Sequence, residues 1–179
     1  MQQNANPGVK WGIVAGLALI LLNVLSWIAG YDVLFSWWNG TVQFCLFIIF
    51  GILAGLEARK QAGGYISFKE ILKPIFTTFV VGSILLAIYQ YILYKFIDPN
   101  LAEGLKQHIM QATETMLHKF KAPQSEIDKQ LDELNATDFK VSLARSFMDL
   151  LKSVIFYFAV SALLALILRK KNRTGDLAN

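Results

Sequence analysis

Residues 11–28 read WGIVAGLALILLNVLSWI, a run of apolar residues without a single charged side chain. At a helical rise of about 1.5 Å per residue such a run covers about 27 Å, close to the thickness of the hydrocarbon core of a bilayer. Three further runs of this kind follow, at residues 37–56, 74–96 and 150–168. The sequence therefore predicts an all-α integral membrane protein, a four-helix bundle formed by one domain over residues 1–179.

Composition supports this class and argues against others. Of the 179 residues, 55% are hydrophobic, and the formal net charge is +4. Basic loops on one side of a membrane explain that charge, so no nucleic acid partner is expected. A cleaved signal peptide is the alternative for the first run, but its exit, SWIAGYD at 26–32, offers no pair of small residues for a peptidase.

The basic residues beside the spans predict the orientation. The 29–36 loop has none, whereas Lys10 precedes the first span and basic residues gather in the 57–73 loop and after the fourth span (Arg59, Lys60, Lys69, Lys73, Arg169, Lys170, Lys171 and Arg173). Positive residues stay on the cytoplasmic side. Both termini and the 57–73 loop are therefore expected in the cytoplasm, and the 97–149 segment outside.

Residues 63–70, GGYISFKE, join the second span to the third. Gly63 and Gly64 allow a turn with positive φ, and Ser67 with Glu70 matches the S-x-x-E pattern of a helix-starting capping box. Because Pro74 cannot donate to a carbonyl one turn earlier, we expect a short interfacial helix over 68–73 and a kink at the proline. The alternative is a phosphate or lipid-headgroup site at the glycines and the basic loop, for whose amides Glu70 competes.

The motifs at this junction carry a resemblance. The pattern R-x-x-x-G-G-Y-I-S-F-K-E at 59–70, followed by YKFIDPN at 94–100, resembles a family of small four-span bacterial inner-membrane proteins that is catalogued as a domain of unknown function. The resemblance implies a multi-pass protein of the bacterial inner (cytoplasmic) membrane over nearly the whole chain. It brings no catalytic residues.

Each span carries a polar residue at a similar distance from its outer end. These residues are Asn23, Gln43, Gln90 and Tyr157, each about 8–9 Å below the outer boundary at helical rise. One interpretation is a layer of interhelical hydrogen bonds. The other is an outward-facing polar pocket for a small ligand or a lipid head.

Small residues recur at four-residue spacing in every span: Gly12 and Gly16, Gly51 and Gly55, Ser83 and Ala87, Ser161 and Ala165. Such pairs let helix backbones approach closely in lipid. They favour a compact bundle, and they suit a homo-oligomer equally well.

Residues 99–149 are too polar to cross a bilayer. Apolar residues at helical spacing, interrupted at Pro123, predict an extracytoplasmic amphipathic helical hairpin between spans 3 and 4. Asn135 and Asp138 can cap a further helix that runs into the fourth span. The hairpin is expected either to cover its own apolar face against the outer surface or to dock another envelope protein.

The sequence offers no machinery for chemistry. No ionisable residue lies in the middle of a span, which argues against an ion-coupled transporter, and His108 and His118 point away from each other on one helix. We expect no cofactor, no metal and no enzymatic activity. The leading hypothesis is a structural or accessory membrane subunit with lipid and protein contacts, and the alternative is a small facilitator or lipid-handling protein.

Overall fold

The computed structural model describes residues 6–139 and 141–170. Four helices in this part of the chain are long and apolar enough to cross a membrane: α1 (Pro7–Ala29), α3 (Trp37–Gln61), α4 (Phe68–Ile92), which a π-helical turn extends over Leu93–Ile97, and α7 (Leu143–Leu168). Each predicted run lies within one of them. The all-α fold with four membrane-length helices is confirmed.

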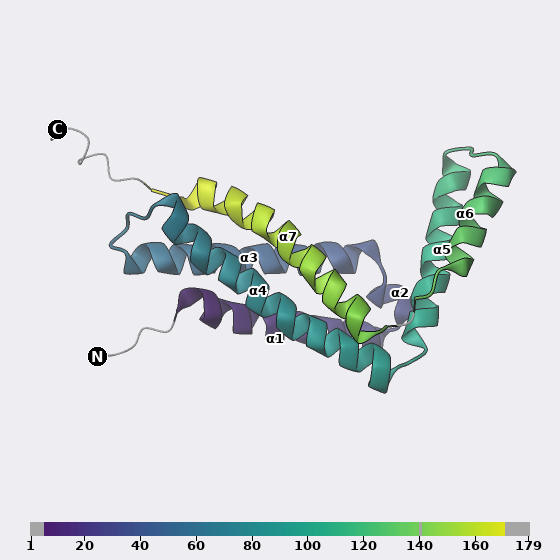
Figure 1. Cartoon of the computed structure of the whole chain (residues 1–179), viewed down its shortest axis with the longest axis horizontal. Helices are drawn as coiled ribbons and strands as arrows, with labels where there is room; N and C mark the ends of the chain where they lie inside the picture. Colours follow the sequence, from purple (N-terminus) through teal and green to yellow (C-terminus); the bar gives the residue numbers. More distant parts are fainter. Residues whose placement is uncertain (1–5, 140, 171–179) are drawn as a thin grey trace.

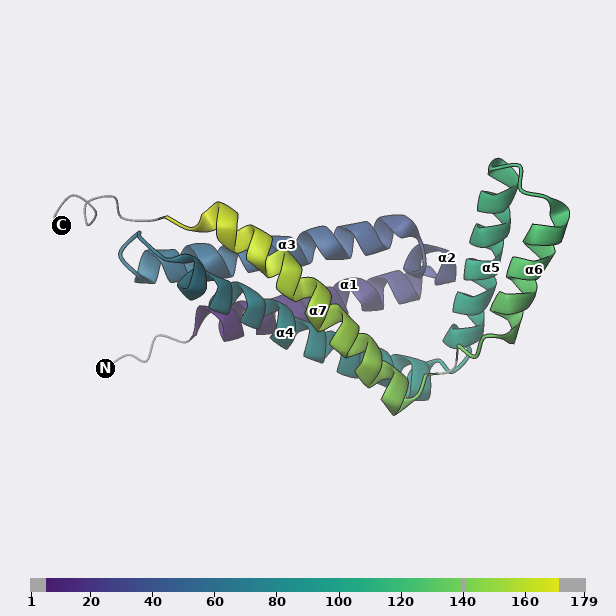
Figure 2. The same ribbon diagram turned by 45° about the horizontal axis from the view of Figure 1, so that its top comes forward.

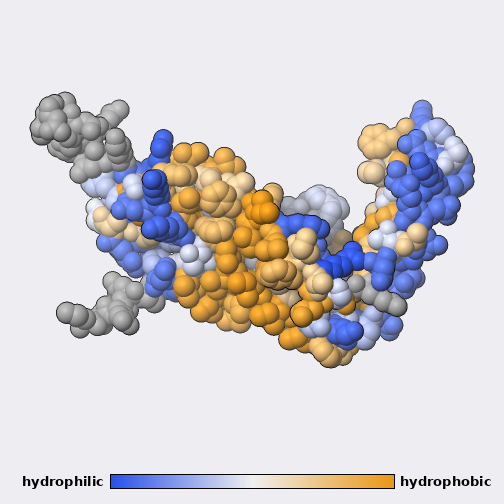
Figure 3. All heavy atoms as spheres, viewed as in Figure 1, coloured by the Kyte–Doolittle hydropathy of each residue, from blue (hydrophilic) through white to orange (hydrophobic). Residues whose placement is uncertain are grey.

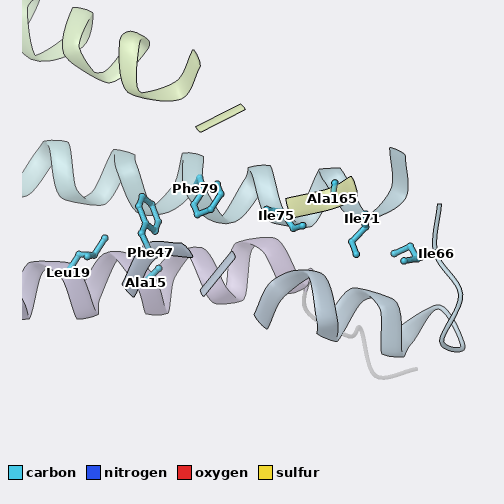
Figure 4. Close-up of a cluster of buried hydrophobic side chains, with 8 residues drawn as sticks. All are labelled: Ala15, Leu19, Phe47, Ile66, Ile71, Ile75, Phe79 and Ala165. Atoms are coloured by element: carbon cyan, nitrogen blue, oxygen red, sulfur yellow. The ribbon is translucent and has the colours of Figure 1, made fainter. Parts of the chain in front are cut away.

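The four long helices form one bundle around α4. Helix α1 packs along one side of α4, α7 packs along another side, and α3 lies beside α1 and α4 (Figure 1). A cluster of fully or nearly fully buried side chains from all four helices and the α3–α4 turn fills the interior (Figure 4): Ala15, Leu19, Phe47, Ile66, Ile71, Ile75, Phe79 and Ala165. Lipid offers no hydrophobic drive for helices to associate, so this close packing is what holds the bundle together.

Glycines bring the helices into close contact. A Cβ added to Gly12 would lie 2.7 Å from the Val81 Cβ of α4, and one added to Gly51 would lie 2.6 Å from the Phe79 ring. Real Cβ atoms are essentially never that close to a neighbour, so neither position has room for a side chain unless its neighbour shifts. The glycine pairs of the first two spans therefore serve contacts within the chain.

One end of the bundle, here called the terminal end, holds both described chain ends and the α3–α4 turn. Gly63 and Gly64 take positive φ values of 75° and 92°, and Ser67 with Glu70 forms the capping box of α4. The Ser67 amide and hydroxyl donate to Glu70 Oε2 at 2.9 and 2.6 Å. An isolated antiparallel bridge joins Ile66 to Lys170 just after α7.

The expected separate interfacial helix over 68–73 is wrong, because α4 runs unbroken through Pro74. Tertiary packing outweighs the missing hydrogen bond. Pro74 is buried where Gly8 of α1 approaches it, and a Cβ on Gly8 would lie 2.7 Å from the Pro74 carbonyl oxygen. The Thr78 hydroxyl donates to the carbonyls of Pro74 and Gly8 at 2.9 and 3.2 Å, which ties the two helices together at this point.

The other end, here called the hairpin end, carries three further helices: α2 (Tyr31–Leu34), α5 (Leu101–Lys119) and α6 (Gln124–Ala136). Helices α5 and α6 form a hairpin that runs crossways to the spans in both views (Figures 1 and 2). Ile127 is buried in the hairpin, whereas Met116 and Phe120 are 50% and 79% exposed. The hairpin meets the bundle at its base, where Gly104 approaches the Tyr31 ring and His108 lies near Phe35.

The predicted caps of the last helix are also wrong. Asn135 lies inside α6, whose C-cap is Thr137, and α7 begins after Ser142, whose hydroxyl accepts from the Arg145 amide at 3.2 Å. A residue inside a helix cannot start the next one, so the start of α7 moves past Asp138.

Hydrophobic side chains gather over the middle of the bundle, and hydrophilic ones gather on the hairpin and at the terminal end (Figure 3). This distribution is that of a multi-pass membrane protein.

Candidate functional site

A cavity of about 340 Å³ lies between α4 and α7 in the half of the bundle nearest the hairpin end. Its walls come from both helices, Phe47 of α3 reaches its deep part, and Leu105, Phe139 and Val141 contribute near the hairpin. Helices α3 and α7 contact each other through Phe47 and Tyr157, with ring centroids 4.9 Å apart, but their hairpin ends stand apart in both views (Figures 1 and 2). A second ring pair, Phe44 with Phe156, joins the same two helices at 6.0 Å between centroids, so the cavity lies beside two spans whose ribbons diverge toward the hairpin end.

An aromatic trio forms the deep end. The Phe79 ring lies 4.9 Å from Phe47 and stacks on Tyr157 at 5.1 Å between centroids. Phe47 and Phe79 are buried, so these three rings from α3, α4 and α7 close the cavity toward the terminal end. Stacked and edge-to-face pairs of this kind stabilise a core beyond the contact area they bury.

The structure separates the four residues of the predicted polar layer into two pairs. Asn23 Nδ2 donates to Gln43 Oε1 at 3.0 Å, which is an interhelical hydrogen bond between α1 and α3. Gln90 and Tyr157 both line the cavity between α4 and α7. Asn23 and Gln43 therefore have the geometry of an interhelical hydrogen bond, and Gln90 and Tyr157 have the geometry of a pocket lining.

Tyr157 lies deeper in the bundle than Gln90. Tyr157 stacks on Phe79, which precedes Gln90 by eleven residues, or about 16 Å along α4. The reason lies in the start of α7. The apolar run begins at residue 150, whereas the helix begins at Leu143, so Tyr157 is further from the outer end than the run alone indicates.

Ser83 has an unusual state at the cavity wall. It is 6% exposed, and its hydroxyl has no hydrogen-bond partner in the described part of the chain. The Tyr89 hydroxyl is also buried without a partner there, whereas those of Ser26, Thr78 and Ser161 each donate to the carbonyl one turn earlier. A buried polar group without a partner costs about 1–3 kcal/mol, so a hydrogen-bond acceptor from outside the chain would recover that free energy at Ser83.

Charged side chains stand at the mouth of the cavity, near the start of α7. Arg145 donates to the Asp138 carbonyl, and its guanidinium lies 5.8 Å from the centre of the Phe139 ring. Asp149 lies one turn further along α7 and is paired with Lys152 at 3.4 Å. Arg145 and Asp149 both line the cavity, which therefore has a positive and a negative group at one end and apolar walls further in.

A carboxylate between α4 and α5 ties the hairpin end together. Asp98 Oδ2 accepts from the Trp27 indole at 3.0 Å and from the Tyr31 hydroxyl at 2.5 Å. Desolvation acts to raise the pKa of Asp98, but the hydrogen bonds from Tyr31 and Trp27 outweigh it, and the pKa lies below its usual value. The hydrogen bond to Asp98 raises the pKa of the Tyr31 hydroxyl. Sequence analysis missed this contact, since nothing in YKFIDPN indicates which aromatic residues reach the aspartate.

An ion pair ties the terminal end together. Glu57 accepts from Lys10 Nζ at 2.9 Å and from the Trp11 indole at 2.6 Å. Sequence reasoning counted Lys10 toward orientation and missed its partner. Lys171 and Arg173, counted the same way, lie outside the described residues.

The groups of the alternative headgroup site at the α3–α4 turn are already engaged. The amides of Gly63 and Gly64 donate to the carbonyls of Lys60 and Arg59 at 3.2 and 2.9 Å. Arg59 itself donates to the Leu168 carbonyl at 3.3 Å. The glycine amides of the turn are therefore used within the chain, which argues against an anion site built on them.

Potential metal ligands are scattered within residues 6–139 and 141–170. No group of three or more His, Cys, Asp or Glu side chains could hold a metal ion there. His118 lies 3.9 Å from Glu114, one turn away on α5, and both side chains are more than half exposed.

Comparison with known proteins gives one match. The family model described as Protein of unknown function (DUF4199) matches residues 10–170, so the chain belongs to this family. No curated protein and no solved structure matches the chain.

Proposed function

We propose that this member of the DUF4199 family is a non-enzymatic accessory subunit of the bacterial inner membrane, which presents its hairpin outside the cell membrane to a partner protein. In this proposal both termini lie in the cytoplasm, as the basic loops predict. The observation that carries the proposal is the hairpin itself. Its helices span residues 101–136, and it meets the described part of the bundle at its base, through Gly104 and His108.

The charge of α6 indicates the kind of partner. This arm of the hairpin holds four acidic side chains and one basic one, all of them exposed. Surface charge of one sign steers association with a surface of the opposite sign. The partner expected here is an envelope protein with a basic surface, and a second copy of this chain is the competing occupant.

Site-specific photocrosslinking in living cells tests this function. A crosslinking residue is placed at Met116 or Asp132 on the hairpin, and at Ile155, a 73% exposed side chain of α7, as the lipid-facing control. The proposal expects one protein adduct that both hairpin positions share and the control lacks. Replacing Asp132 and Glu133 by Lys, with the crosslinker at Met116, is expected to remove it. Adducts with lipid or with the chain itself alone would contradict the accessory role.

A second candidate function is a facilitator or lipid-handling protein. The cavity between α4 and α7 favours it, because Gln90 and Tyr157 line a space of about 340 Å³, within the size range of ligand pockets. Loss of transport or lipid binding when Gln90 becomes Leu would support this candidate, and an unchanged rate would count against it. The two candidates are compatible, since they use different parts of the molecule.

A further inference from the structure

We infer that the cavity between α4 and α7 binds one zwitterionic glycerophospholipid from the leaflet at the hairpin end. The inference deepens the second candidate function by naming its ligand, and it does not depend on a hairpin partner. Four features of the cavity carry it: its position where α3 and α7 diverge, its apolar walls, the opposite charges at its mouth and the unpaired Ser83 hydroxyl.

Position favours a lipid over a water-soluble ligand. The cavity extends from the start of α7 to the aromatic trio near the middle of the bundle, and Leu86, Ala87 and Leu150 contribute apolar walls. The ribbons of α3 and α7 diverge toward the hairpin end (Figure 2), and the cavity is not enclosed, so membrane lipid can reach it. A ligand that fits must have a polar end near the membrane surface and a long apolar end.

The two charged groups select the head of the ligand. Arg145 is a planar guanidinium with five donors, of which one is used on a carbonyl, and such groups suit phosphate. Asp149 follows one turn later on the same face of α7, and its carboxylate, which lies 3.4 Å from Lys152 Nζ in an exposed pair, has a second oxygen for an ammonium group. A phosphate and a primary ammonium a few bonds apart make up the head of phosphatidylethanolamine.

Ser83 supplies the third contact. It lies seven residues from Gln90, about 10 Å deeper along α4, on the wall of the same cavity. In a glycerophospholipid the ester groups lie on the acyl-chain side of the phosphate, so a lipid whose chains enter the cavity carries its ester carbonyls deeper than its phosphate. An ester carbonyl that reaches Ser83 would accept from its hydroxyl, which has no partner in the described part of the chain.

Native mass spectrometry of the full-length protein tests the inference. The protein is released from nanodiscs of phosphatidylethanolamine and phosphatidylglycerol in equal parts, with matched acyl chains. The expected result is a single retained lipid, with phosphatidylethanolamine several-fold in excess. Millimolar inorganic phosphate, added to the nanodiscs before release, should leave that adduct unchanged.

Variants assign the contacts. Ser83→Ala should reduce the retained lipid about fivefold, which corresponds to one neutral hydrogen bond. Arg145→Gln should reduce retention of both lipids, and Asp149→Asn should remove the preference between them. Ser161→Ala, a buried hydroxyl outside the cavity, and Lys119→Gln, a charge on the hairpin, are the matched controls and should behave as the wild type.

Three results would overturn the inference. They are equal retention of both lipids by the wild type, displacement of the adduct by inorganic phosphate, and an unchanged adduct in Ala87→Phe, where a ring fills the cavity. Circular dichroism checks that Ala87→Phe folds. If it does not fold, the lipid preference of the exposed Asp149→Asn variant decides whether the inference stands. The hairpin crosslinks are read separately, so failure here leaves the accessory role standing.

Discussion

Two glycines of α3 make a stringent test of the packing, because the same substitution should have opposite effects at each. A Cβ at Gly51 would lie 2.6 Å from the Phe79 ring, whereas a Cβ at Gly40 would meet nothing within 4 Å. Phe79 is fully buried and stacked on Tyr157, so its ring cannot move without disturbing the aromatic trio. Gly51→Ala should therefore destabilise the bundle, and Gly40→Ala should not.

The magnitudes follow from overpacking and from backbone entropy. Forcing one extra methyl into a packed core costs typically about 1–3 kcal/mol. Replacing an exposed helical glycine by alanine stabilises by roughly 0.5–1 kcal/mol. The unfolding free energies of the two variants should thus differ by roughly 1.5–4 kcal/mol, with the wild type between them.

Unfolding by increasing SDS in mixed micelles, followed by far-UV circular dichroism and tryptophan fluorescence, measures both variants under one condition. Gly51→Ala should unfold at a lower SDS fraction than the wild type, and Gly40→Ala at the same or a higher fraction. Equal midpoints for the two variants would refute the assignment of Gly51 to the interface with α4.

The polar contacts give three further predictions, read in the same unfolding assay. Hydrogen bonds lower the pKa of Asp98 in the folded protein, so ionised Asp98 contributes its full stabilisation above the ordinary carboxyl pKa of about 4. That stabilisation is lost as the pH falls through the lower pKa of the folded state. The wild type should therefore lose stability in this acidic range, and Asp98→Asn should not. At neutral pH, Asp98→Asn should cost about 1–2 kcal/mol, a figure reduced for its partly exposed setting, and Tyr31→Phe should cost less because one donor remains. A double-mutant cycle of Asn23→Leu and Gln43→Leu should give a coupling of about 0.6 kcal/mol, and additive effects would show that their hydrogen bond contributes nothing.

The spans and the helix start at Ser67 could be predicted because their signals are local. An apolar run must be helical in a bilayer, where each backbone group needs a partner, and a capping box involves only four consecutive residues. The same locality explains the error at Pro74. Its effect on the helix depends on Gly8, which lies far away in the sequence and packs against it.

The contacts between distant residues could not be predicted in the same way. Asp98 meets Trp27 and Tyr31 only because the hairpin ends of α1 and α4 lie side by side, and Glu57 meets Lys10 for the same reason at the terminal end. The depth of Tyr157 in the bundle was not predicted, because the hydropathy that identifies the span does not show at which residue α7 begins. A cavity depends on the mutual tilt of helices, and hydropathy carries no information about tilt.

Labelling of single cysteines in whole cells tests the membrane arrangement most directly. In a Cys45→Ser background, cysteines are placed at the exposed positions Gln130 in the hairpin and Lys69 beside the α3–α4 turn, and a membrane-impermeant maleimide is added before or after lysis. The account predicts that position 130 reacts in intact cells and that position 69 reacts only after lysis. Reaction of position 69 in intact cells, with position 130 protected, would show that the hairpin lies on the inner side and would contradict the arrangement on which the accessory role depends.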